Sequence, residues 1–102
     1  MKKIPASIGS ATVISYTPID GRHKATEKTR HIVGGQVQSP MAGLAICQYP
    51  EDSGYYLFYC DADWTEVTDT WHASIEDAKH QAEFEYEGSS KTWIDAAIPA
   101  KS

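Results

Sequence analysis

The feature that most constrains the fold is residues 55–60, Tyr-Tyr-Leu-Phe-Tyr-Cys, which would be apolar on both faces of a strand. A strand with no polar face is central in its sheet and covered on both sides. The turn signal 61–63 and a more polar segment, 64–72, predict a neighbouring antiparallel strand. We expect a helix to cover one face of this sheet, and either the N-terminal segment or a second copy of the protein to cover the other.

Residues 75–87 predict that helix. Ser74 is a favourable N-cap, and Asp77 three residues later completes a pair similar to a capping box. At 100° per residue, one narrow face gathers four apolar side chains: Ile75, Ala78, Ala82 and Tyr86. Phe84 points the other way, and Gly88 is a natural residue with which to end the helix.

The chain of 102 residues predicts one α+β domain. Its antiparallel sheet should have about four strands, roughly 11–19, 42–49, 55–61 and 64–72, with the helix 75–87 on one face. Residues 1–10 and 96–102 are expected to be flexible ends. Residues 21–41 form a basic, glycine-containing loop or hairpin arm, which is long for a structureless connection.

Charge is divided unevenly along the chain, whose formal net charge is -5. Residues 1–31 carry six basic and two acidic side chains, whereas residues 32–102 carry three basic and twelve acidic ones. The acidic part would attract a basic protein and repel a nucleic-acid duplex, although the basic segment 22–31 could touch phosphates. The predicted partner-binding surface combines acids with aromatic anchors: Asp61, Asp63, Trp64, Glu66, Asp69, Trp71, Glu83, Phe84 and Glu87. Glu85 is expected among the same exposed acids.

The two cysteines are interpreted as free, buried thiols in a reducing compartment. If Tyr49 pairs with Tyr55, Cys47 and Cys60 point to opposite faces of the sheet, while a register shifted by one residue would place them on the same face. The N-terminus lacks the apolar segment of a signal peptide, and no apolar run is long enough to span a membrane. We therefore expect a cytoplasmic protein.

No motif predicts a catalytic, cofactor-binding or metal-binding residue. An EF-hand starting at Asp61 fails because its sixth and twelfth positions hold Glu66 and His72. Cys60, His72 and Asp69 have the residue types of a nucleophilic triad, but Cys60 lies in the predicted buried strand, where a thiol is inert.

The favoured function is a non-enzymatic protein-interaction module. In size, charge and expected architecture the chain resembles the compact inhibitors and immunity proteins of bacteria and phages, without sharing a motif with them. That resemblance implies a basic partner such as a nuclease or toxin. One alternative is a homodimer in which the twin covers residues 55–60 and encloses a small-ligand pocket, and the other is a small cysteine- or metal-dependent enzyme.

Overall fold

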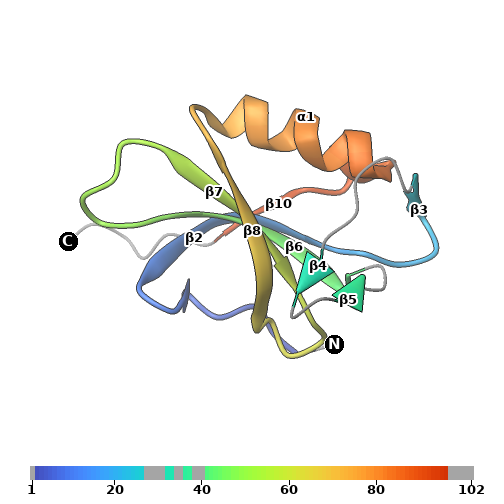
Figure 1. Cartoon of the computed structure of the whole chain (residues 1–102), viewed down its shortest axis with the longest axis horizontal. Coiled ribbons are helices and arrows are strands. Elements are labelled where there is room, and N and C mark those ends of the chain that lie inside the picture. Colours follow the sequence, from blue (N-terminus) through green and yellow to red (C-terminus); the bar gives the residue numbers. More distant parts are fainter. Residues whose placement is uncertain (1, 27–31, 34–35, 38–40, 97–102) are drawn as a thin grey trace.

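Figure 1 shows the computed structural model of the chain, which describes residues 2–26, 32–33, 36–37 and 41–96. In chain order its elements are β1 (Ser7–Ile8), β2 (Ala11–Pro18), β3 (Lys24–Ala25), β4 (Ile32–Val33), β5 (Gln36–Val37), β6 (Gly43–Gln48), β7 (Tyr55–Cys60), β8 (Glu66–His72), α1 (Ile75–Glu85), β9 (Tyr86–Glu87), the 3₁₀ helix η1 (Ser89–Lys91) and β10 (Ile94–Asp95).

A curled antiparallel sheet with one helix on it confirms the predicted α+β class (Figure 1). Its strand order is β1-β2-β6-β7-β8, and β10 pairs with the later part of β2. The four predicted strands are present as β2, β6, β7 and β8. The sheet has more strands than predicted because β1 and β10, of two residues each, both add to the free edge of β2.

The helix forms where the sequence predicts it, but it is shorter. The backbone N–H of Asp77 donates to the Ser74 hydroxyl over 3.0 Å, which caps the first turn. Ala78 and Ala82 are fully buried, so the backbone of α1 lies close to the sheet. The helix ends at Glu85 rather than at residue 87, because the next two residues form β9 and pair with β3.

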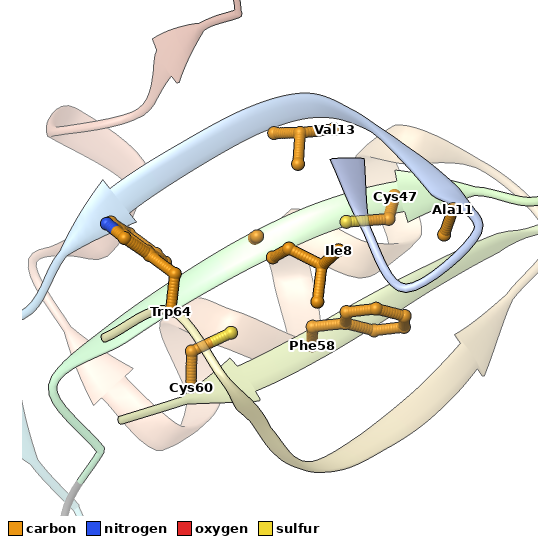
Figure 2. Close-up of a cluster of buried hydrophobic side chains, with 8 residues drawn as sticks. Ile8, Ala11, Val13, Cys47, Phe58, Cys60 and Trp64 are labelled. Carbon is orange, nitrogen blue, oxygen red and sulfur yellow. The ribbon is translucent and has the colours of Figure 1, made fainter. Parts of the chain in front are cut away.

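The two faces of the sheet bury separate cores. The helix-side core contains Met41, Leu44, Ile46, Leu57, Tyr59, Ala78, Ala82 and Tyr86. The opposite core, drawn in Figure 2, contains Ile8, Ala11, Val13, Ala45, Cys47, Phe58, Cys60 and Trp64. The N-terminal segment thus covers the second face of β7, as one of the two expected arrangements requires. Residues 7–8, within the predicted flexible end, belong to this cover.

Both cysteines are free and buried, and they lie on the same face of the sheet (Figure 2). The expected register was wrong by one residue: Cys47 pairs with Tyr56, and Cys60 with Gly43. Side chains alternate along a strand, so this single step brings the two thiols to one side. Burial raises the pKa of both thiols to about 12, which leaves them protonated and inert near neutral pH.

The segment 21–41 contains three short strands, with β4 paired to β5 and β3 paired to β9. Within that predicted loop, residues 27–31, 34–35 and 38–40 lie outside the described residues, as does the C-terminal end from residue 97. Among the described residues, no helix is both long enough and apolar enough to cross a membrane.

Candidate functional site

A β-bulge in β8 brings together the acids that define the candidate site. Thr68 pairs with Tyr59, yet Glu66 pairs with the next residue of β7, Cys60, so Val67 is an extra residue on β8. In a regular strand, positions 66 and 69 would point to opposite faces. The bulge instead puts Glu66 on the face that carries Asp69, and bulges commonly redirect side chains near functional sites.

That face lies opposite the helix. Asp69 pairs with Phe58, and Trp71 with Tyr56, both on the side of the sheet that α1 leaves uncovered. We call the surface formed by Tyr49, Tyr56, Glu66, Asp69 and Trp71 the β8 face. Because β8 is an edge strand of the sheet, no further strand of the described residues lies beside it, and a partner could approach this surface from the β8 edge.

Glu66 and Asp69 form a carboxyl pair. Burial, then a hydrogen bond to Asp69 and the charge of Asp69, raise the pKa of Glu66 to about 7. Among the described residues, no lysine or arginine forms an ion pair with either acid. A pKa near 7 makes the Glu66 carboxyl partly protonated near neutral pH, a perturbation typical of functional sites.

Three aromatic side chains share the β8 face with this acid pair. The rings of Tyr49 and Tyr56 meet edge to face, with centroids 5.2 Å apart at 84°. The side chain of Trp71 is 55% exposed, although its indole lies against Gly54, where an added Cβ would come within 2.2 Å of the indole nitrogen. Burial raises the pKa of Tyr56, and so do the charge of Asp52 and the hydrogen bond that the Tyr56 hydroxyl donates to it. An exposed indole beside carboxylates is a favourable contact for a cation.

The turn between β7 and β8 uses three of the predicted site residues structurally. The Asp61 carboxylate accepts hydrogen bonds from the backbone N–H groups of Asp63 and Thr65, at 2.9 and 3.0 Å. Trp64, predicted to be an exposed anchor, is 3% exposed, and its indole donates to the Lys2 carbonyl over 2.7 Å. Asp63 forms an exposed ion pair with Lys2 at 3.6 Å. The turn thus fastens the N-terminal segment to the sheet.

The remaining predicted site residues lie at the C-terminal end of α1, away from the β8 face. Glu83 accepts hydrogen bonds from the backbone N–H groups of Gly88 and Ser90, at 3.0 and 2.9 Å, which lower its pKa. Phe84 is 47% exposed, and Glu87 is exposed in β9. The nine predicted residues therefore fall into three sets of three, in the turn between β7 and β8, on the β8 face and at the C-terminal end of α1.

Glu85, expected at the surface, is buried in the helix-side core. The hydroxyl of Tyr59 donates to its carboxylate, and the Gln81 amide donates to the same oxygen over 2.6 Å. Burial and the neighbouring Glu85 raise the pKa of Tyr59, while a hydrogen bond from Thr70 opposes that rise. The acid is satisfied within the protein, as a buried carboxylate must be.

A second polar cluster, which the sequence did not predict, joins β8 to the start of α1. One ring nitrogen of His72 lies 2.7 Å from the Thr70 hydroxyl, and the other lies 2.8 Å from the Asp77 carboxylate. These are the connections of a hydroxyl–His–Asp triad. Here, however, the hydroxyl faces the helix-side core with Leu57, and Asp77 is the exposed member. The cluster holds the capped helix end against the sheet.

The alternative enzyme site is not assembled. Cys60 lies on the face opposite the helix, whereas His72 pairs with Tyr55 on the helix side, so β7 separates the thiol from the imidazole. Within the described part of the chain, no group of three or more potential metal ligands comes together.

Comparison of the chain with protein-family models, curated proteins and solved structures gave no match.

Proposed function

We propose that this protein is a non-enzymatic interaction module that binds a basic protein through the β8 face. The observation that carries the proposal is the exposed indole of Trp71, which shares one face of an edge strand with Asp69 and Glu66. Tryptophan and tyrosine are over-represented among residues that dominate binding energies. Lysine or arginine side chains of a partner could pair with the acids and stack on the rings.

The β8 face fits this role better than the helix end does. At the helix end, Glu83 is already bonded to two backbone N–H groups and Glu85 is buried. On the β8 face, Asp69 is exposed, and neither it nor Glu66 forms an ion pair with a described lysine or arginine. Charge that has no internal cation to neutralise it is available to steer a basic partner such as a nuclease or toxin.

Paired variants test the proposal. Asp69→Asn/Trp71→Ala removes one charge and one exposed aromatic from the β8 face, and Glu87→Gln/Phe84→Ala removes the same from the helix end. Each tagged variant would be incubated with nuclease-treated lysate of the organism that carries the gene, and bound proteins quantified by mass spectrometry over a salt series.

We expect at least one basic protein to be captured by the wild type and by the helix-end variant. Its recovery should fall by about tenfold or more with the β8-face variant, as the loss of an interface hot spot predicts, and should decrease as salt increases. If no captured protein distinguishes the two variants, the β8 face is not the binding surface.

A further inference from the structure

A groove runs between the N-terminal segment and the start of β8. Its walls are Pro5, Ser7, Ile8, Gly9, Trp64, Thr65 and Glu66, and its volume is about 410 Å³. Small-molecule sites have volumes of roughly 300–1,000 Å³ and combine apolar walls with a few polar groups. Its lining is mixed in this way, since the exposed Pro5 and the largely buried Ile8 and Trp64 line it together with the polar Ser7, Thr65 and Glu66.

Glu66 is the one ionisable side chain of the groove lining. It reaches the groove because the bulge at Val67 turns position 66 toward the face opposite the helix. Asp69 is its hydrogen-bonded neighbour on β8, and together the two acids lack a described lysine or arginine partner. The electrostatic character of the groove is therefore acidic.

Trp64, which is only 3% exposed, belongs to the groove lining and has an unusual backbone conformation. Its φ is 62°, in the left-handed region that bulky residues rarely occupy. Two contacts hold it there, because its N–H donates to the Asp61 carbonyl over 3.0 Å and its indole donates to the Lys2 carbonyl. The edge of Tyr16 also meets the indole, with centroids 5.8 Å apart. The wall is thus held rigid before any ligand arrives.

We propose that this groove is a binding site for a small organic cation, a primary ammonium or guanidinium group on a short aliphatic chain. The cationic group pairs with the Glu66 carboxylate, and the aliphatic chain lies along Pro5, the exposed apolar residue of the lining. The site needs no protein partner, so this inference does not rest on the proposed function.

Binding of such a cation should release protons near neutral pH. The carboxyl of Glu66, whose pKa is about 7, is partly protonated there, and a bound cation favours its carboxylate form. Four ionisable groups face Glu66: Asp69 on β8, Tyr49 after β6, and the buried thiols of Cys47 and Cys60. Burial is the main cause of the raised pKa of Tyr49 and of both thiols, and the charge of Glu66 adds to it. The thiols remain protonated, so the carboxyl pair supplies the released proton.

The experiment uses n-butylammonium and n-butylguanidinium as probes and n-pentanol as the neutral control. Amide chemical shifts of ¹⁵N-labelled protein locate binding, and calorimetry at pH 7 in two buffers of different ionisation enthalpy counts the protons released. For ligands of this size we expect a dissociation constant of about 1 mM, since small fragments bind weakly. The shifts should concentrate at residues 7–9 and 64–66, with about half a proton released per cation bound.

Three variants make the test specific. Glu66→Gln should weaken cation binding by about tenfold or more, because it removes the charge that pairs with the cation. Asp69→Asn keeps the Glu66 charge and removes the neighbouring charge that helps to keep Glu66 protonated, so binding should persist with less proton release. Glu87→Gln removes one acid far from the groove and should bind like the wild type.

The same spectra show whether each variant is folded. The inference is overturned if folded wild-type protein shows no localised shifts at about 20 mM cation, well above the expected dissociation constant. It is also overturned if n-pentanol produces the same shifts, or if Glu66→Gln binds both cations as tightly as the wild type.

Discussion

The polar side chains on the two faces of the sheet differ in whether the protein supplies their hydrogen-bond and ion-pair partners. On the helix side, Glu85 is bonded to Tyr59 and Gln81, and His72 is bonded to Thr70 and Asp77. On the other side, Glu66 and Asp69 are hydrogen-bonded to each other, and no described lysine or arginine forms an ion pair with either. The first arrangement stabilises the fold, whereas the second leaves charge available for a ligand. Polar groups near the sheet are therefore structural or functional according to whether the protein itself satisfies them.

Replacing Tyr59 should have the largest effect on stability. Tyr59→Phe leaves the buried Glu85 carboxylate without one of its donors, and losing a hydrogen bond to a buried charged group costs about 2–3 kcal/mol. Tyr56→Phe is the matched control on the other face: Tyr56 is half-buried and its hydroxyl bonds to Asp52 near the surface, so the loss should be smaller, less than about 1 kcal/mol. Urea denaturation at pH 7 measures both. Equal effects of the two substitutions would show that the faces do not differ in this way.

A smaller loss is expected at the link between β8 and α1. His72→Phe keeps a ring at this position but removes both hydrogen bonds, which should destabilise the protein by about 1–2 kcal/mol. Asp69→Asn, three residues away on the opposite face of the same strand, should leave the urea midpoint unchanged or raise it, because it relieves repulsion of Glu66. A midpoint that falls equally in both variants would contradict the structural role of His72.

The sequence predicted the part of the fold that local patterns determine. The sequence patterns that predict β7, apolar on both faces, and the Ser74 cap each lie within a few residues. The central strands and the helix therefore lie where they were expected. The two-residue strands β1 and β10 show no periodicity and exist only through pairing with β2. The register of β6 with β7 depends on the geometry of the intervening turn, which the residues 49–54 do not determine by themselves.

The candidate site was predicted only in part, for two physical reasons. Glu85 lies seven residues after Ala78, which is nearly two full turns, so the helical period places it on the buried face. It was nevertheless expected at the surface, because charged residues are rarely buried. By contrast, nothing in the sequence marks the bulge at Val67 that turns Glu66 toward Asp69. The spacing of Thr70 and His72, two residues apart on one strand with an acid in the first helical turn, could have indicated their cluster.

The acid pair should make stability depend on pH in a way that the helix side does not. The folded-state pKa of Glu66, about 7, is above the ordinary value of 4.5, so the folded protein binds more protons between these pH values. Wild-type stability therefore falls as pH rises through this window, and Glu66→Gln should not share that loss. Because Glu66 is only half-buried and solvent screens its charge, we expect a relative gain of only about 1 kcal/mol for the variant between pH 5 and pH 8. Urea titrations at pH 5 and pH 8 measure the difference in unfolding free energy between Glu66→Gln and the wild type. The same difference at both pH values would contradict the raised pKa.

The smallest effect on stability is expected where the indole of Trp71 lies against Gly54. In Gly54→Ala the new Cβ would come within 2.2 Å of the indole nitrogen, so the ring must move. Since the side chain is already 55% exposed, it can turn into solvent, and stability should fall by about 0.5 kcal/mol or less. The indole N–H resonance of Trp71 should shift, while that of Trp64, held by the Lys2 carbonyl, should not.

Gly54→Ala moves the Trp71 indole without removing it, so it tests whether binding depends on where the ring lies. If the β8 face binds a protein through Trp71, Gly54→Ala should reduce capture of that protein nearly as much as Trp71→Ala does, although the tryptophan is still there. A variant that moves the Trp71 resonance and still captures the partner at the wild-type level would show that the acids alone carry recognition. Simultaneous movement of both indole resonances would instead show that the β8 face and the Trp64 turn form one coupled unit.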